Sequence, residues 1–225
     1  YVVAADGTGT PRNLTPGEHQ HEGIAWLTDS SAILTSGSRH EGWDRDLVSD
    51  IYVVPLDVEV RRLTGGTSEH FAPSVSPDGK RFAVLGVDDP LLSPQNIRVG
   101  VGSLDDGAVT WVSTDLDRTF SPTTGVRAPL WRSDDTLLAL AEDRGETHLY
   151  ELAADGSTAP RKLTDGAISI TGFDAAGGTV AMVETAVDHP GELVTLDGPI
   201  TEITNRRRGW ERFAVPCTDG SALSS

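Results

Sequence analysis

Short clusters of histidines and acids are the first candidates for chemistry in this chain. His19-Gln20-His21-Glu22 gathers two imidazoles and a carboxylate, which are ligand types that zinc accepts. Acidic runs such as Asp44-Arg45-Asp46, Asp88-Asp89 and Asp134-Asp135 offer oxygens of the kind that calcium binds. The histidine cluster lacks a third metal ligand nearby, and no acidic run has EF-hand spacing. We therefore interpret these clusters as solvated loops and expect no metal and no cofactor.

Nucleophilic catalysis would need an activated serine or cysteine. A G-x-S-x-G elbow exposes the serine of α/β-hydrolases on a strained turn between a strand and a helix. The 225 residues contain no such pentapeptide. Cys217 is the only cysteine, so it forms no disulfide within the chain and no CxxC motif. His148 starts a predicted strand, and we interpret it as a structural residue. The chain by itself is expected to have no catalytic residues.

One long loop, about 36–49, concentrates charged and aromatic side chains. Loops on a rigid scaffold are where binding residues gather. The candidates for contact with a substrate or with another domain are Arg39, Glu41, Trp43, Arg45 and Asp46. The alternative, in which the loop folds flat over its own strands, stays open at this point.

The long loop lies within one unit of a sequence repeat. The pairs Leu14-Thr15, Leu63-Thr64, Leu163-Thr164 and Ile203-Thr204 recur, with Val112-Ser113 in the same place. Their spacings are 49, 49, 51 and 40 residues. An apolar marker and an acid, as in Trp26-x-x-Asp29, open each unit and lead into turn residues and short apolar runs. Trp26 and Trp131 occupy the marker position, so we expect both of them to pack between units.

Four short strands in each unit of about 50 residues indicate the blades of a β-propeller. The sequence thus predicts an all-β fold with complete blades at about 18–66, 67–116, 117–166 and 167–205. The segment 1–15 supplies only two strands of an earlier blade. Four and a half blades do not close a ring, so we expect a propeller fragment whose open edges permit self-association. Residues 206–225 are predicted to be a linker.

Strand direction predicts a functional face. Successive strands of a blade run antiparallel, so the loops between second and third strands share one face with the connections between blades. That face would carry the loops at 36–49, 86–95, 142–147 and 184–190 and the connections at 17–22 and 67–70. The chain leaves the last blade on the same face. Its basic run, Arg206-Arg207-Arg208, is either a solvated linker or a partner for acidic groups of the propeller or of a following domain.

Composition excludes some partners. Lysine and arginine number 18 and aspartate and glutamate 34, which gives a net charge of −16. Nucleic acids and anionic membranes reward a basic face, so we expect neither as a partner. No apolar run is long enough to span a bilayer. The charge keeps the protein soluble and mildly favours cationic ligands.

The repeat units carry a resemblance to a known family. The run LTGG…APSVSPDGKRFAVLG, the charged segment Arg39–Asp50 that leads into IYVVPLD, and the terminal GWERFAVPCTDGSAL resemble the propeller of prolyl oligopeptidase-type serine peptidases. The acylaminoacyl-peptidase and dipeptidyl-aminopeptidase-like branch is the most similar. The periplasmic TolB propeller uses the same Leu-Thr and Ser-Pro-Asp-Gly units.

The resemblance implies a role without chemistry of its own. A propeller of this family caps an α/β-hydrolase domain, restricts entry to peptides and supplies part of the substrate pocket. The implied partners are therefore a peptide substrate and a hydrolase domain in the parent protein. The alternative is a TolB-like scaffold that binds protein partners and has no catalytic domain. The family and the lone thiol of Cys217 lead us to expect a cytoplasmic protein.

Overall fold

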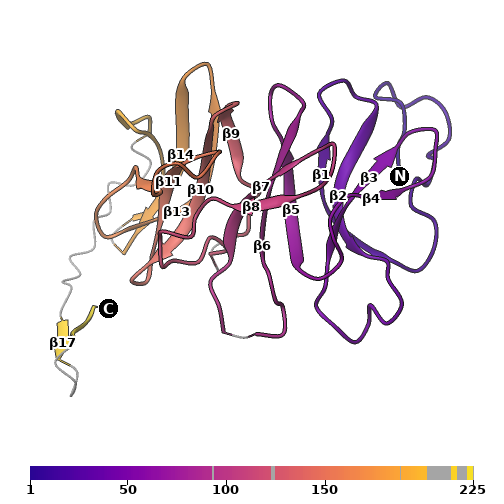
Figure 1. The fold of residues 1–225 in the computed structure, drawn as a ribbon. Coiled ribbons are helices and arrows are strands. Elements are labelled where there is room, and N and C mark those ends of the chain that lie inside the picture. The colour runs from indigo at the N-terminus through magenta and orange to yellow at the C-terminus, as the bar shows by residue number, and fades with distance from the viewer. Residues whose placement is uncertain (93, 123–124, 188, 202–213, 217–221, 225) are drawn as a thin grey trace.

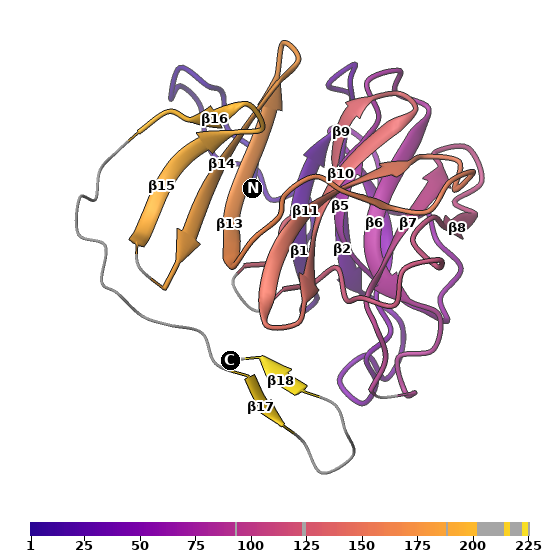
Figure 2. The same cartoon turned by 90° about the vertical axis from the view of Figure 1, so that its left-hand side faces the viewer.

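The chain forms an all-β structure of four twisted antiparallel blades that stand side by side (Figures 1 and 2). The structure, a computed structural model, describes residues 1–92, 94–122, 125–187, 189–201, 214–216 and 222–224. No helix among these residues has the length and apolarity needed to cross a bilayer. Three features singled out in the sequence lie outside the described residues: Ile203-Thr204, Arg206-Arg207-Arg208 and Cys217.

Within each blade the strands follow chain order; blades 1 and 2 are separate four-stranded sheets, and one parallel bridge joins blades 3 and 4 into a sheet of eight strands. Blade 1 contains β1 (Gln20–Trp26), β2 (Ala32–Ser38), β3 (Asp50–Pro55) and β4 (Arg61–Arg62). Blade 2 contains β5 (Glu69–Val75), β6 (Arg81–Val87), β7 (Arg98–Ser103) and β8 (Val109–Trp111). Blade 3 contains β9 (Leu130–Ser133), β10 (Thr136–Asp143), β11 (Glu146–Ala153) and β12 (Arg161–Lys162). Blade 4 contains β13 (Ile168–Ala176), β14 (Thr179–Ala186), β15 (His189–Thr195) and β16 (Gly198–Pro199).

Two further strand pairs flank the blades. Near the N-terminus a single bridge joins Val2 to Arg12, as expected for two strands of an incomplete blade. Near the C-terminus β17 (Ala214–Pro216) pairs with β18 (Ala222–Ser224). The predicted fold class, a propeller fragment of about four complete blades and two additional strands, is confirmed.

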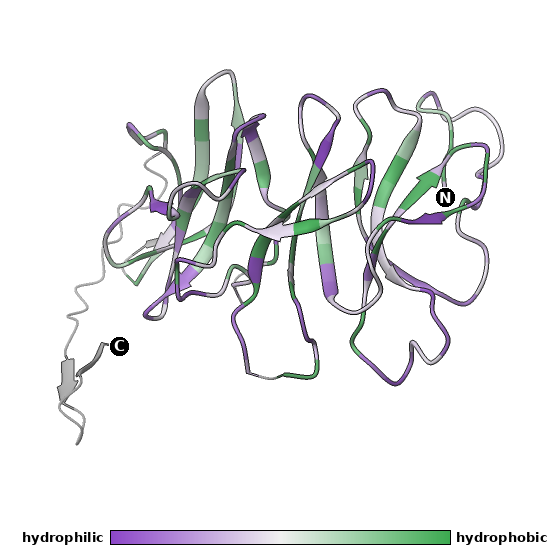
Figure 3. Cartoon of the chain, in the orientation of Figure 1, coloured by the Kyte–Doolittle hydropathy of each residue, from purple (hydrophilic) through white to green (hydrophobic). Residues whose placement is uncertain are grey.

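Three apolar layers hold the blades together. Leu34 and Ile51 of blade 1 pack with Phe82 and Val84 of blade 2, and equivalent clusters join blade 2 to blade 3 and blade 3 to blade 4. Alternation along each strand turns one set of side chains to the preceding blade and the other to the following blade. Figure 3 shows hydrophobic residues along the strands and hydrophilic residues in the loops. The core therefore lies between the sheets.

The repeated apolar marker faces the preceding blade. Val75, Trp131 and Phe173 pack into the layers behind their own blades. Trp26 holds the same place in blade 1, yet it is 46% exposed. The expectation that Trp26 is packed between blades was wrong, because Trp26 belongs to none of the three apolar layers formed by the described residues. The expectation for Trp131 holds, since it packs on the layer between blades 2 and 3.

The recurring Leu-Thr pair has a structural cause. After the fourth strand the Thr64 hydroxyl accepts a hydrogen bond from the Ile51 backbone N–H at 3.0 Å. Ser113 and Thr164 do the same for third-strand amides of blades 2 and 3 at 3.0 and 3.1 Å. The apolar residue of the pair bonds through its own N–H to the third strand, as Leu63 does to Ile51. Each hydroxyl thus fastens the end of a blade to its third strand.

In blade 4 the equivalent hydrogen bonds are made by Ile200-Thr201, whereas Ile203-Thr204 lies outside the described residues. The Leu193 N–H donates to the Thr201 hydroxyl at 2.9 Å, and the Ile200 N–H donates to the Leu193 carbonyl at 2.8 Å. The hairpin between β15 and β16 turns tightly, since Thr195 pairs directly with Gly198. The fourth strand consequently arrives earlier than a fixed repeat length predicts.

Candidate functional site

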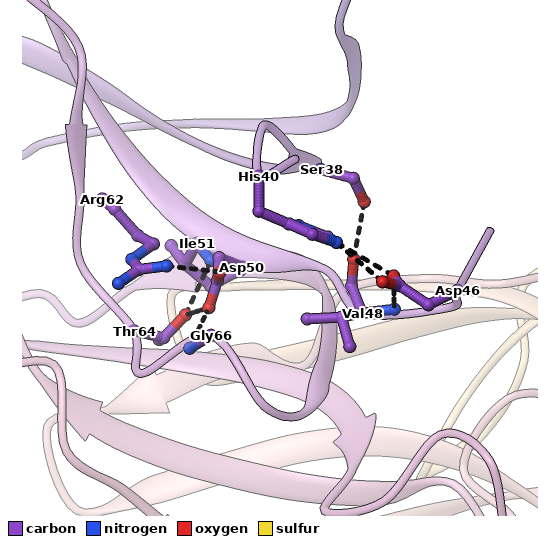
Figure 4. Close-up of polar contacts among 9 residues, drawn as sticks. All are labelled: Ser38, His40, Asp46, Val48, Asp50, Ile51, Arg62, Thr64 and Gly66. Carbon is purple, nitrogen blue, oxygen red and sulfur yellow. Dashed lines mark hydrogen bonds and ion pairs between the residues drawn. The ribbon is translucent and has the colours of Figure 1, made fainter. Parts of the chain in front are cut away.

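Within the loop between β2 and β3, residues 39–49, a hydrogen bond joins His40 to Asp46 (Figure 4). His40 Nε2 lies 3.0 and 2.9 Å from the two oxygens of Asp46. Asp46 Oδ1 also accepts the Val48 N–H at 3.0 Å, and the Ser38 hydroxyl donates to the Val48 carbonyl at 2.7 Å. The hydrogen bond from His40 is the main cause that lowers the pKa of Asp46. The loop is thereby held as a compact turn that projects Trp43.

A buried carboxylate anchors the point where this loop enters β3 (Figure 4). Asp50 is 1% exposed, and its Oδ1 accepts hydrogen bonds from the Thr64 hydroxyl at 2.7 Å and the Gly66 N–H at 2.9 Å. Arg62 NH1 lies 3.8 Å from Asp50 Oδ2. The Thr64 hydroxyl also accepts a hydrogen bond from the Ile51 N–H. One hydrogen-bond network therefore joins the end of the loop, the third strand and the segment that follows the fourth strand of blade 1.

A second anchor joins the loop to blade 2. Ser49 and Glu69 form a parallel bridge, and the His70 N–H donates to the Ser49 carbonyl at 2.9 Å. The Ser49 hydroxyl in turn donates to the His70 carbonyl at 2.8 Å. Blade 3 meets blade 4 by the same kind of bridge, between Thr147 and Ser169. The start of β5 is therefore fixed against the loop.

An open groove of about 620 Å³ lies beside the loop. Its carboxylates and large apolar side chains are Glu22, Asp44, Asp46 and Glu69 together with Trp43, Leu47, Phe71 and Val126. No lysine, arginine or histidine is among the described residues that line it. We name it the loop groove. Burial raises the pKa of Glu69 within it. The combination of carboxylates with an indole and a phenyl ring suits a ligand that has a cationic group and an apolar body.

The five predicted residues separate into three groups. Trp43 and Asp46 line the loop groove. Arg39 turns back to β1, where its NH1 lies 3.0 Å from His21 Nε2. Glu41 and Arg45 are exposed. None of these positions is contradicted by the structure, and their contact with a substrate or a second domain stays a prediction.

Sequence reasoning missed the groove residues outside the loop. Glu22 comes from β1, Glu69 and Phe71 from β5, and Val126 from the connection between blades 2 and 3. The first three lie near the starts of first strands, which share a face with the loops between second and third strands. That face was predicted, and it was the only signal in the sequence that could have found them.

His148 takes part in a triad-like arrangement that is structural. Its Nδ1 lies 3.1 Å from the Thr164 hydroxyl, its Nε2 lies 2.9 Å from Glu146, and its side chain is fully buried. Thr164 is 8% exposed, and its hydroxyl already accepts a hydrogen bond from the Leu149 N–H. A substrate has no access to such a hydroxyl, so the interpretation of His148 as a structural residue holds. Among the described residues no group of three or more histidines, cysteines and acids is arranged to hold a metal.

Acid is expected to destabilise the protein through His70. His70 is 5% exposed and stacks on Trp111 at 5.7 Å between ring centroids. Burial lowers its pKa, while Asp50 and Asp88 act in the opposite direction. As pH falls below about 6.5, the unfolded chain binds a proton before the folded chain does. The contribution of a neutral, buried His70 to the free energy of unfolding should therefore be complete above that pH and be lost progressively below it.

Urea unfolding at about pH 8 and about pH 5.5 measures this loss. In His70→Gln the difference between the two pH values should shrink, since the variant has no imidazole at this site. His21, whose pKa is lowered first by burial and then by Arg39, remains in that variant and sets the residual slope. An unchanged pH dependence in His70→Gln would contradict the assignment to His70.

Comparisons with known proteins bear on the fold. No family model and no curated protein matches the sequence. A Mycobacterium tuberculosis puromycin-hydrolyzing peptidase matches in structure with a TM-score of 0.67 at 20% identity, over 90% of this chain and 35% of that one. A Pyrococcus horikoshii acylaminoacyl peptidase matches with 0.67 at 18% identity, over 94% and 32%. The β-propeller domain of the Trilobed protease from Pyrococcus furiosus matches with 0.60 at 20% identity, over 85% and 56%.

TolB of Acinetobacter baumannii matches as well, with a TM-score of 0.59 at 16% identity over 87% of this chain and 46% of that one. The chain spans about a third of the length of the two peptidases. At these identities the likeness establishes architecture, and the described chain is a portion of a β-propeller with the fold that these peptidases and TolB share.

Proposed function

We propose that the chain is the propeller portion of a prolyl oligopeptidase-like serine peptidase, in which it gates the active site and binds part of a peptide substrate. The loop groove carries this proposal. It combines four carboxylates with Trp43 and Phe71, and it lies on the face where the loops between second and third strands meet the connections between blades. The structural likeness to two peptidases of greater length supports it.

The division of labour follows from the residues present. The chain has no G-x-S-x-G serine, so acyl transfer belongs to a hydrolase domain of the parent protein. The propeller positions the peptide through contacts remote from the reacting bond, which raises kcat/KM for substrates long enough to reach it. A groove lined by carboxylates favours peptides that present a cationic group beside an apolar side chain.

Replacing Trp43 and Arg45 with alanine in the parent enzyme tests the proposal. We expect kcat/KM to fall about 5- to 30-fold for peptides, because losing an aromatic and a charged contact raises the barrier by about 1–2 kcal/mol. A small ester that does not reach the propeller should be hydrolysed at an unchanged rate. Equal effects on both substrates, or no effect on either, would show that the loop is only structural.

A second candidate is a scaffold that binds protein partners without a catalytic domain, and the match to TolB favours it. The coding sequence downstream of Ser225 separates the two candidates. A G-x-S-x-G within the following couple of hundred codons supports the peptidase, and a stop codon supports the scaffold. We further propose that the protein acts in the cytoplasm; fractionation of cells followed by immunodetection tests this.

A further inference from the structure

The first strand of each blade is its inner strand, and the inner strand of blade 3 is shorter than those of the other blades. β9 has 4 residues, whereas β1 and β5 have 7 each and β13 has 9. Pro129 directly precedes β9, and a proline has no N–H with which to extend a strand ladder. Pairing of β9 with β10 is accordingly confined to Thr136–Leu138 of β10. Residues 125–129 therefore leave the sheet of their own blade.

These five residues, which we name the strap, line the loop groove and contact blades 2 and 4 instead. Val126 lines the loop groove beside blade 1. The Pro129 carbonyl accepts a hydrogen bond from the Ser74 hydroxyl of β5 at 2.5 Å. Arg127 reaches β13 of blade 4. The strap consequently crosses the space between the inner strands, which are neighbours of one another.

Arg127 latches the strap to blade 4. Its NH2 lies 3.4 Å from Asp174 Oδ1, and its guanidinium carbon lies 4.8 Å from the centre of the Phe173 ring. The Arg127 and Asp174 side chains are 40% and 77% exposed, so the ion pair is a weak one. Val126 is 57% exposed and adds little burial. A segment whose side chains make such exposed contacts with the described residues is expected to open more readily than the blades around it.

We propose that the strap is a movable wall of the loop groove and that the Arg127–Asp174 pair is its latch. When the latch is closed, Val126 narrows the groove beside Trp43. Release of Arg127 from blade 4 lets the strap withdraw and admits a longer ligand. Only this consequence for ligands rests on the proposed function, since the latch itself is a property of the described chain.

Limited proteolysis with an arginine-specific protease tests the latch without any substrate. Cleavage after Arg127 requires the strap to open, and its rate follows the open population when opening is fast. We expect Asp174→Ala to raise this rate about 2- to 5-fold, as for loss of an exposed ion pair. Asp174→Lys should raise it about tenfold, because a like charge then faces Arg127. Cleavage after Arg144, in the exposed β10–β11 turn, is the internal reference.

Asp57→Ala is the matched control, since it removes the exposed pair between Arg12 and Asp57 at 3.3 Å, far from the strap. The control should leave cleavage after Arg127 unchanged. An unchanged rate in both Asp174 variants would overturn the latch, and so would an equal increase after Arg144, which would mean general destabilisation.

The role as a groove wall has its own measurement in the parent enzyme. Asp174→Lys should raise kcat/KM for long peptides relative to short ones. Faster cleavage after Arg127 with an unchanged ratio would overturn the assignment of the strap as a groove wall. Failure of the Trp43 and Arg45 experiment would contradict the proposed function and leave the proteolysis result intact.

Discussion

Asp50→Ala is expected to lower the free energy of unfolding by about 2–4 kcal/mol, because two hydrogen-bond donors near a buried site lose their acceptor. These donors are the Thr64 hydroxyl and the Gly66 N–H. Urea unfolding at neutral pH measures the change. In the variant we expect the loop that carries Trp43 to open from its Asp50 end. The amide hydrogen of Ile51, which is bonded to Thr64, should therefore also exchange faster.

Asp50→Asn is the matched control for this network. The amide oxygen can still accept both hydrogen bonds, and Arg62, whose side chain is half exposed, can be solvated without its partner. We expect a loss of less than half that of Asp50→Ala. A loss as large as that of the alanine variant would show that the charge of Asp50, and not its role as an acceptor, stabilises the loop end.

Leu149→Ala is expected to cost about 2–5 kcal/mol, whereas Leu193→Ala should cost about 1 kcal/mol or less. The two leucines are equivalent by position, since each donates its N–H to the hydroxyl that ends its blade. Leu149 is fully buried between blades 3 and 4, while Leu193 on blade 4 is 37% exposed. The same truncation therefore removes much more buried area at Leu149.

Thermal or urea unfolding of the two variants side by side measures this difference. Equal losses would mean that the outer face of blade 4 is covered in solution, for example by a second copy of the chain. Val183, which pairs with Leu193, is 41% exposed on the same face. In that event Val183→Lys should reduce the apparent mass in sedimentation experiments.

The loop groove also shows how weak and strong contacts are distributed around the site. The loop end is fixed by the buried Asp50 network and by the paired hydrogen bonds of Ser49 with β5. The opposite wall, at Val126, depends on the exposed pair of Arg127 and Asp174. If the strap moves as we propose, the groove has one fixed side with Trp43 and one side that adjusts its width, which would suit peptides of varied length.

The sequence by itself determined the architecture, because the features that repeat along it are fixed by local hydrogen bonds. Ser76 and Asp78 close the same tight turn that the Ser-Pro-Asp-Gly run predicts, with the Ser76 hydroxyl 2.6 Å from Asp78 Oδ1. The Leu-Thr pair recurs because each blade must fasten its fourth strand to its third. The long loop was identified from its insertion length and its mixture of charged and aromatic residues.

Only the tertiary structure decided which residues meet. Glu22, Glu69 and Val126 lie far apart in sequence, and they share a groove with Trp43 because blades pack face to face and the strap leaves its own sheet at Pro129. The pair Ile200-Thr201 comes early in the repeat for a related reason, since hairpin length varies between blades while the hydrogen-bond geometry does not. Hydrogen bonds within a blade involve residues close in sequence, so their pattern repeats along the chain. Which distant residues line one groove depends instead on how the blades pack against one another.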